Sequence, residues 1–344
     1  MDVAKLAGVS KGTVDRVVHN RGEVSKKSTE KVKKVIKELE YEPNLYASLL
    51  ATKKEHTIAC LIPTHNEGEY WDRIQRGFIK GGESAKSFNV QTELFSYDQY
   101  SSESFKEVSK QLLASNPSGV VLPPLFKTDT RALSDKLTEK GIPYVYVDTK
   151  LEDDSYFAYF GMPMYQSGYL CAHLLTERCA PEQVKEVVVV RITRDKGRQS
   201  DPSLNRREGF MDFMAEHFPN CDIHNVFINP HDERDIYLTL DHFFKEHKGI
   251  KFVVMFNSRI HLIADYLAKK PVEGRRVIGF DNLEKNMDAL KAGLVTILIT
   301  QHTEDQSFYA VQALVDFILL HKKPAKKDNY MHMDILTRLN FDYY

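Results

Sequence analysis

Apolar residues recur at two different intervals along this chain, and the change between the intervals divides it. Near the N-terminus, Val32, Val35, Ile36 and Leu39 recur at helical spacing, which predicts one buried stripe on an amphipathic helix. From Thr57 onward the pattern changes to short, nearly continuous apolar runs separated by amphipathic helical stretches. Such runs predict parallel strands in sheets that helices cover on both faces. We therefore expect a small all-α N-terminal domain followed by an α/β body.

The strand-and-helix pattern of the body occurs twice, with a restart after about residue 160, and two α/β lobes are therefore expected. In such sheets, ligands bind at the C-terminal ends of the strands. The expected strands cover residues 57–63, 90–97, 119–124 and 144–149 and then 186–192, 252–256 and 276–280, with helices at 71–88, 165–178 and 204–217.

The first 21 residues predict two short helices joined by a tight turn. Gly8 tolerates the positive φ of the turn, Ser10 can cap the second helix, and Val14 points back toward the core. Helical spacing places Val14, Val17 and Val18 on one side and Lys11, Gly12, Asp15, Arg16 and His19 on the other side or its edges. A helix that exposes Lys and Arg is typical of the groove-reading element of a helix-turn-helix, and an ordinary helical hairpin is the alternative.

Two further helices are expected before the body. Ser25 is a candidate N-cap for the helix that carries Val32. Pro43 ends that helix and can occupy the first turn of a short helix over residues 45–50, which a charged connector follows.

Residues 2–51 resemble the DNA-binding head of LacI/GalR transcriptional regulators. The resemblance rests on the run DVAKLAGVS-x-x-TV-x-RV, then VS, then KV-x-x-x-I-x-EL-x-Y-x-PN-x-x-A-x-x-L. It implies a three-helix headpiece and a hinge helix that forms on operator DNA. Two heads of a homodimer would bind a pseudo-palindromic double-stranded operator through the major groove. The residues that the resemblance assigns to DNA are Lys11, Gly12, Thr13, Arg16, Asn20, Ser25, Asn44, Ala47 and Leu50.

Among these residues, Lys11, Gly12 and Arg16 fall at the base-reading positions of the family, and Leu50 matches the leucine wedged into the minor groove. An Arg can form two hydrogen bonds to one guanine, and an apolar wedge replaces base stacking and bends the DNA.

This chain also departs from the family pattern. Gly12 offers no side chain for base reading, and Asp15 brings a carboxylate close to DNA. Ser48 and Thr29 stand where the family often has Arg, which should weaken nonspecific binding. Met1 directly precedes Asp2, so either the true start lies upstream or the first helix frays.

Charge is distributed unevenly along the chain. Residues 1–56 carry a net charge of +4 and the remainder −5, within a total of −1. A basic head on a slightly acidic body suits a DNA-binding protein, although some of the lysines can simply form a solvated helix face.

No apolar run of membrane-spanning length and no leader-type segment is evident, so a cytoplasmic protein without a membrane partner is expected. Cys60, Cys171, Cys179 and Cys221 are scattered, which favours reduced thiols over a metal or disulfide site.

The body resembles the periplasmic-binding-protein type I fold that LacI/GalR regulators share with sugar-binding proteins. The fold class expected is therefore a multidomain chain with an all-α headpiece and a two-lobed α/β body of parallel sheets. The resemblance implies three crossings between the lobes. The expected boundaries are a headpiece at 1–42, a hinge at 43–56 and a body at 57–344, with the first lobe at about 57–160 and 294–320 and the second at about 161–290 and 321–344.

The resemblance also implies an effector site at the strand ends. The candidate residues are Tyr70, Trp71, Asp148, Arg206, Asn257, Asp281 and Gln301. Aromatic rings can stack on the apolar faces of a sugar, and paired polar groups can bond vicinal hydroxyls. A lone Asp or Asn after a strand is more often a turn residue or a helix cap, so the set carries more weight than any member. Sugar-binding relatives often follow the Asp with Arg, whereas Thr149 follows Asp148 here, so a grip like that of a ribose-binding protein is not expected.

Basic residues gather in the loop after residue 190. They could bind a phosphate or acid group on the effector, but a solvated loop is favoured. These residues are Arg191, Arg194, Lys196 and Arg198.

Two other classes of protein are alternatives to a DNA-binding regulator. A solute-binding protein would share the body but would have no use for residues 1–56, and a sugar-acting enzyme would need a catalytic motif that is not evident. We expect no enzymatic activity, no cofactor and no metal.

An effector, expected to be a sugar or sugar derivative, would close the lobes and change a dimer contact near residues 72–88 and 101–114. Whether it releases or strengthens DNA binding is left open.

Overall fold

The computed structural model describes residues 3–18, 22, 24–39, 54–152, 155–192, 204–270 and 274–344. It divides into two compact units, residues 1–54 and 55–344. Several predictions lie outside the described residues. They concern Asn20, Asn44, Ala47, Leu50, the hinge helix over residues 45–50, and the basic residues Arg194, Lys196 and Arg198.

The first unit holds the helices α1 (Val3–Ala7), α2 (Lys11–Val18) and α3 (Lys26–Glu38). Gly8 has a φ of 62°, and the side chain of Ser10 accepts from the backbone N–H of Thr13 at 3.1 Å, as the turn and cap predictions required. Ser25 caps α3 by accepting from the N–H of Ser28. Val3, Ala7 and Val32 form a small buried core, against which Val9, Val14, Val17, Val35, Ile36 and Leu39 pack.

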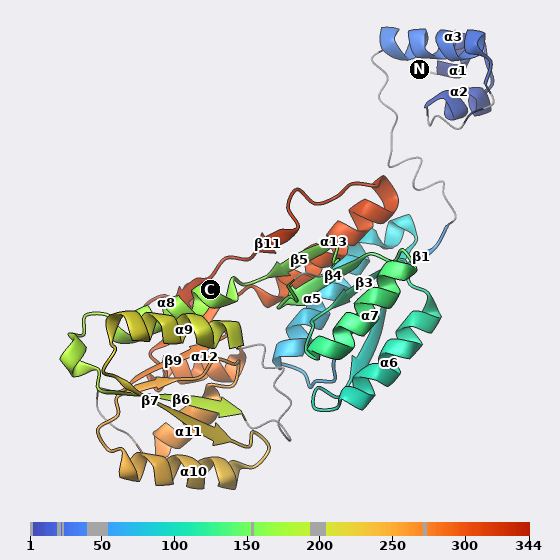
Figure 1. Cartoon of the computed structure of the whole chain (residues 1–344). Helices are drawn as coiled ribbons and strands as arrows, with labels where there is room; N and C mark the ends of the chain where they lie inside the picture. Colours follow the sequence, from blue (N-terminus) through green and yellow to red (C-terminus); the bar gives the residue numbers. More distant parts are fainter. Residues whose placement is uncertain are drawn as a thin grey trace. The chain divides into compact units, whose positions relative to one another are not determined.

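The second unit contains two six-stranded sheets, each covered by helices on both faces (Figure 1). The first sheet has the order β11-β5-β4-β3-β1-β2, and the second has the order β12-β10-β9-β8-β6-β7. All paired strands are parallel except β10 and β12. The α/β fold class is confirmed.

The first lobe is built on the first sheet. Its strands are β1 (His56–Pro63), β2 (Val90–Tyr97), β3 (Gly119–Leu122), β4 (Tyr144–Asp148), β5 (Ala158–Gly161) and β11 (Asp328–Tyr330). Its helices are α5 (Tyr70–Ala85), α6 (Ser102–Ser115), α7 (Lys127–Glu139) and α13 (Thr303–Leu320), with a 3₁₀ turn η1 (Lys86–Phe88).

The second lobe is built on the second sheet. Its strands are β6 (Glu186–Ile192), β7 (Asp222–Ile228), β8 (Phe252–Val254), β9 (Arg276–Phe280), β10 (Ile297–Thr300) and β12 (Asp334–Leu336). Its helices are α8 (Met164–Thr176), α9 (Leu204–His217), α10 (Glu233–Glu246), α11 (His261–Lys269) and α12 (Glu284–Lys291), with 3₁₀ turns η2 (Pro181–Gln183) and η3 (Phe341–Tyr343).

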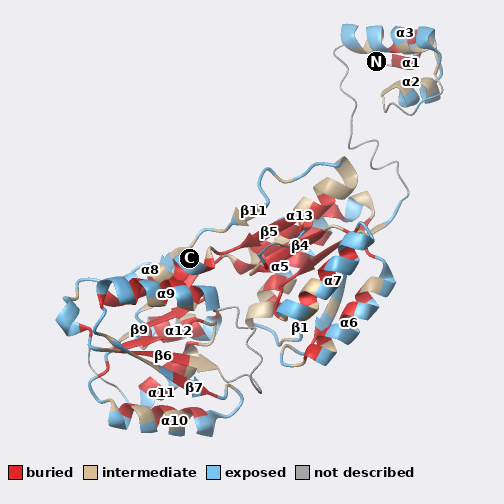
Figure 2. Cartoon of the chain, viewed as in Figure 1, coloured by how far each residue is buried: buried red, intermediate tan, exposed pale blue. Residues whose placement is uncertain are grey.

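Alternate residues of the central strands enter two different cores. In β1, Ile58, Cys60 and Ile62 pack against α5 and α13, whereas Ala59 and Leu61 pack against α6 and α7. The second lobe follows the same rule, with Val188 facing α10–α12 and Val187 facing α8 and α9. Figure 2 shows these strands as buried in both lobes. A strand buried on both faces reads as a continuous apolar run, which is why the sequence located most of them correctly.

The chain crosses between the lobes three times, as predicted, but two crossings fall later than predicted. The strand β10 extends the second sheet beside β9, so residues 294–300 lie with the second lobe, and the crossing follows Thr300. After α13 the chain stays with the first lobe until β11 has paired with β5. The predicted boundaries near 294 and 321 were therefore wrong, because β10 and β11 have only four and three residues and leave little periodicity to detect.

Candidate functional site

Two aspartates occupy matching places in the two lobes. Asp148 ends β4 in the first lobe, and Asp281 directly follows β9 in the second. Both are buried, and both have a left-handed backbone, with φ of 67° and 68°. Left-handed geometry is uncommon for residues with a side chain, and it persists only where the surroundings hold it. The matched geometry indicates that both carboxylates are positioned by the fold.

A chain of hydrogen bonds connects the two aspartates. The hydroxyl of Tyr70, the first residue of α5, donates to Oδ1 of Asp148 at 2.6 Å. Nε2 of Gln301 donates to the Tyr70 oxygen at 3.1 Å and to Oδ1 of Asp281 at 2.8 Å. Gln301 lies at the second crossing between the lobes, so four of the predicted effector residues form one polar network that joins the lobes.

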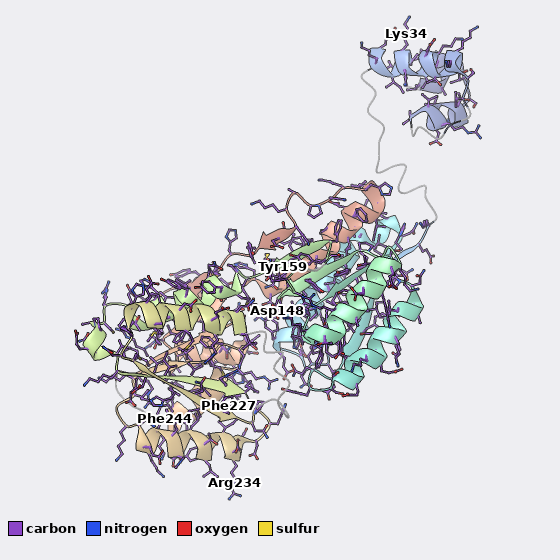
Figure 3. The ribbon with its side chains drawn as sticks, viewed as in Figure 1. Lys34, Asp148, Tyr159, Phe227, Arg234 and Phe244 are labelled. Carbon is purple, nitrogen blue, oxygen red and sulfur yellow. The ribbon has the colours of Figure 1, made fainter. Side chains whose placement is uncertain are left out.

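Supporting residues that the sequence analysis missed hold this network in place. Gln306 is fully buried, and its Oε1 accepts from the backbone N–H of Asp148 at 3.0 Å while its Nε2 donates to the carbonyl of Gln301 at 3.0 Å. The Tyr159 hydroxyl donates to the carbonyl of Asp148 at 3.1 Å. Figure 3 labels Asp148 and Tyr159 on the first lobe. The sequence signal that could have found Gln306 is its position on the face of α13 that continues into the buried apolar residues Ala310, Val311 and Leu314.

Arg206, in the first turn of α9, is buried in the second-lobe wall. Its Nε donates to Oγ of Ser167 at 3.1 Å, and its Nη1 donates to the carbonyl of Phe256. The guanidinium carbon lies 3.8 Å from the ring centre of Phe280, a cation–π contact. This environment fixes the guanidinium beside the cavity. Arg206 therefore has a structural role in addition to the predicted role in ligand binding.

Two glycines bring α8 and α9 close enough for this arrangement. A Cβ at Gly168 would collide with the backbone of Arg206, and a Cβ at Gly209 would collide with the backbone of Tyr165. Ser167, next to Gly168, can therefore reach the Arg206 side chain directly.

All seven predicted effector residues line one cavity of about 840 Å³, which has walls from both lobes. This volume suits a small organic ligand. Arg191 lies in β6, so the prediction that placed it in a solvated loop was wrong. It also lines the cavity, with its guanidinium 5.1 Å from the ring centre of Phe227. Further lining residues that the sequence analysis missed include Tyr100, Phe227, His231, Arg259, His261 and Lys285. Phe227 lies near the end of β7, the others follow strands or lie at the start of helices, and no motif groups them.

Two of the predicted residues also have local roles. The Oδ1 of Asn257 accepts from the backbone N–H of Arg259 at 3.0 Å, which is the turn role considered as an alternative. Trp71 is half-buried and meets the Tyr70 ring edge to face at 5.0 Å. Its indole both packs on the first-lobe core and lines the cavity.

Burial changes the protonation chemistry of the site. It raises the pKa of Asp281 to about 6, while the Arg206 charge and the Gln301 hydrogen bond act in the opposite direction. Burial also raises the pKa of the Tyr70 hydroxyl well above its usual value, and the charge of Asp148 adds to this effect. Tyr70 is therefore a neutral donor at physiological pH, whereas Asp281 changes charge near neutrality.

Other contacts join the two lobes. Arg73 on α5 donates to the side-chain oxygen of Asn282 at 3.1 Å and to its carbonyl at 3.0 Å. The rings of Tyr100 and His231 meet edge to face at 5.7 Å. These pairs join segments from different lobes and are suited to respond to lobe closure.

The predicted DNA-binding residues described in the first unit lie on or next to its helices. Lys11, Gly12 and Arg16 are exposed on α2, and Thr13 is half-buried there. Ser25 is exposed, but its hydroxyl is engaged in capping α3. The helix α2 thus presents two cations away from the small apolar core.

Comparison with known proteins gives consistent results for both units. The model of the lacI family of bacterial regulatory proteins matches residues 1–44, and that of a periplasmic binding protein domain matches residues 58–323. The HTH-type transcriptional regulator CelR of Thermobifida fusca is 34% identical over 144 residues, which is 42% of each chain. The chain thus spans about two fifths of the length of this curated relative.

Solved structures are similar to a larger part of the chain. A LacI transcriptional regulator from Bacteroides fragilis is 35% identical with a TM-score of 0.80, and the match covers 85% of this chain and 100% of that one. The glucose-galactose binding protein GanP from Geobacillus stearothermophilus has a TM-score of 0.70 at 18% identity, covering 83% and 99% of the two chains. At that identity, the second match indicates a shared fold alone. No helix among the described residues is long and apolar enough to span a membrane.

Proposed function

This chain belongs to the lacI family of bacterial regulatory proteins, and on that premise we propose that it is a dimeric, DNA-binding transcriptional regulator controlled by a small carbohydrate-like effector. The observation that carries the effector proposal is the convergence of seven predicted residues on one cavity with walls from both lobes. Residues from segments more than 200 positions apart meet there, as Tyr70 and Gln301 illustrate.

The DNA-binding element is α2. Arg16 and Lys11 are exposed cations on this helix and can reach base edges or phosphates in the major groove. Gly12 and Thr13 lie on the same helix, so the Gly12 backbone and the Thr13 hydroxyl would approach the groove. Ser25 would bind near a phosphate, and Asn20, Asn44, Ala47 and Leu50 complete the proposed set.

The effector chemistry follows from the groups that line the cavity. Asp148 and Asp281 supply acceptors, Gln301 supplies an amide, and Trp71 supplies a flat apolar face. A sugar presents hydroxyls at its rim and C–H groups on its faces, so it can satisfy both kinds of surface. Arg206 and Asn257 add donors from the second lobe.

A screen of monosaccharides and disaccharides by unfolding temperature tests the effector proposal, because a ligand that binds the folded state raises its stability. The same sugar should alter affinity for an operator selected from random-sequence DNA. A lack of stabilisation by all sugars would contradict the sugar proposal while leaving DNA binding intact. Consumption of the stabilising sugar would instead favour a sugar-acting enzyme.

Operator binding has its own test. Arg16→Ala should lower affinity by about 1–3 kcal/mol at one base pair and relax the base preference there. Lys34→Ala is a matched control, since Lys34 is exposed on α3 and lies 3.8 Å from Glu38. Leu50→Ala should reduce DNA bending without changing sugar affinity. Unchanged affinity and bending in the Arg16 and Leu50 variants would contradict the proposed headpiece contacts.

The proposed pseudo-palindromic operator requires a homodimer, because two heads are needed for two half-sites. Sedimentation with and without operator DNA would measure this state. A protein that binds chromosomal operators is expected in the cytoplasm, which fractionation of cells would test.

A further inference from the structure

Two histidines and one glutamate meet in the second lobe, away from the cavity. Glu186 is the first residue of β6, His224 lies in β7, and His247 caps the C-terminus of α10. Nε2 of His224 is 3.1 Å and Nδ1 of His247 is 3.0 Å from the same Glu186 oxygen, Oε1. The three candidate ligand atoms all lie within 4.8 Å of one another. We propose that this cluster is a binding site for a divalent transition-metal ion, with Zn²⁺ as the favoured occupant.

The sheet register explains how the cluster forms. The strands β6 and β7 are parallel, and Val188 is the register partner of His224. Glu186 lies two residues before Val188, so it shares a face of the sheet with His224. The helix α10 packs on this face through the core that contains Val188, and it delivers His247 at its end.

Aromatic packing restricts both imidazoles. The ring of Phe243 stacks on His247 at 4.6 Å and meets His224 at 5.7 Å, and the two imidazole centres are 4.4 Å apart. All three candidate ligands are partly buried, with side chains between 26% and 32% exposed. A site with this exposure is held by its neighbours yet open to an ion from solvent.

The donor set identifies the class of ion. Two imidazoles and one carboxylate are ligands that zinc uses, with a water molecule at the fourth position. Mg²⁺ and Ca²⁺ prefer all-oxygen sites, so the two imidazoles disfavour them. Tetrahedral zinc places ligand atoms about 3.4 Å apart, close to the separations of Glu186 from each histidine.

Metal binding here requires proton relocation but no redox step. His224 and His247 must present unprotonated Nε2 and Nδ1 to the ion, so each neutral ring carries its proton on the other nitrogen. The carboxylate of Glu186 then coordinates the ion instead of accepting hydrogen bonds from the rings. The ion would fasten β6, β7 and the end of α10, and its binding energy would stabilise the second lobe.

The site is separate from the proposed effector cavity. Arg191 and Ile192, near the end of β6, line that cavity, whereas Glu186 is the first residue of the same strand. Five residues of strand separate Glu186 from Arg191 by about 16 Å. In Figure 3, Phe244 marks the end of α10 that carries this cluster, away from Phe227 on the cavity wall.

The test uses the full chain without an affinity tag, stripped by a chelator and titrated with ZnCl₂ in a calorimeter. One Zn²⁺ should bind per chain and should raise the unfolding temperature. His224→Asn and His247→Asn should each weaken binding at least about tenfold and remove the thermal shift. His242→Asn is the matched control, since His242 is exposed on the same helix, and it should bind Zn²⁺ like the unmodified chain.

Two further variants protect the test against misfolding and against a thiol site. Glu186→Gln keeps a hydrogen-bond acceptor for the imidazoles but removes the anionic ligand, so it should stay folded and still bind at least about tenfold more weakly. Cys221→Ser should leave affinity unchanged. Binding no tighter than about 100 μM, or equal binding by the unmodified chain and both histidine variants, would overturn the proposal. Loss of binding in Cys221→Ser would overturn the assigned ligand set.

Discussion

The two walls of the cavity place an aspartate at the same point of a parallel sheet but surround it differently. In the first lobe, the Tyr70 hydroxyl bonds the Asp148 carboxylate, and Gln306 and Tyr159 bond its backbone. In the second lobe, Asp281 accepts from Gln301 and lies in the field of the buried Arg206. The first wall is thus held by neutral hydrogen-bonding groups, whereas a buried cation lies beside the aspartate of the second wall. Matching strand ends thus have different electrostatic surroundings, and each difference can be tested.

Removing the cation should produce the largest effect. Arg206→Ala leaves the Phe256 carbonyl and Ser167 without their partner and exposes the Phe280 face, so we expect a loss of about 3–5 kcal/mol in the free energy of unfolding. Urea unfolding measures this value. Arg207→Ala, the adjacent half-buried residue of α9, should cost much less. Equal losses in the two variants would show that Arg206 does not organise the second wall.

A change of pH should distinguish the second wall from the first by its effect on stability. Because burial raises the pKa of Asp281 to about 6, from an ordinary value of 3.8, its neutral form is favoured in the folded state. Its contribution to stability is fully present below pH 3.8 and is lost as pH rises through 6. As the pH rises from 4 to 7, the free energy of unfolding of Asp281→Asn should therefore increase by about 2–3 kcal/mol relative to that of the unmodified chain. A constant difference across this range, measured by urea unfolding, would contradict the raised pKa.

Both aspartates should contribute to effector binding. With a sugar found by the screen, Asp148→Asn and Asp281→Asn should each weaken binding about 10- to 100-fold, since each removes a charged acceptor from a buried site. Calorimetry measures the two affinities. Asp305→Asn is a surface control on α13, and it should bind normally. If only one of the two site variants loses affinity, the ligand contacts one wall.

Breaking the contact that Arg73 makes between the lobes should have the smallest effect. Arg73→Ala removes two hydrogen bonds to Asn282 that join the lobes, and we expect less than about 1 kcal/mol of lost stability because Arg73 is partly exposed to solvent. The chain has one tryptophan, Trp71, which lies in this cavity, so its fluorescence reports closure directly. The variant should shift the effector concentration that changes this signal. An unchanged fluorescence titration would exclude a role for Arg73 in closure.

Much of the fold could be predicted because the central strands are buried on both faces. The runs 186–192 and 276–280 coincide with the central strands β6 and β9, and the run 90–97 coincides with β2 at the edge of the first sheet. The edge strands β11 and β12 could not be predicted, since three-residue strands with mixed polarity have no distinctive period. The seven effector candidates were predicted from the family resemblance, and their convergence on one cavity supports that choice.

The helix-turn-helix pattern, the two α/β lobes and the polar residues at their strand ends could be predicted, because each rests on local spacing along the chain. Three features follow instead from how the chain packs: Gln306 holds Asp148, Arg206 lies on Phe280, and burial raises the pKa of Asp281. The tertiary structure also brought Glu186, His224 and His247 together, where the sequence had led us to expect no metal. These residues are 38 and 61 positions apart in sequence, and only strand pairing and helix packing can make such distant side chains neighbours.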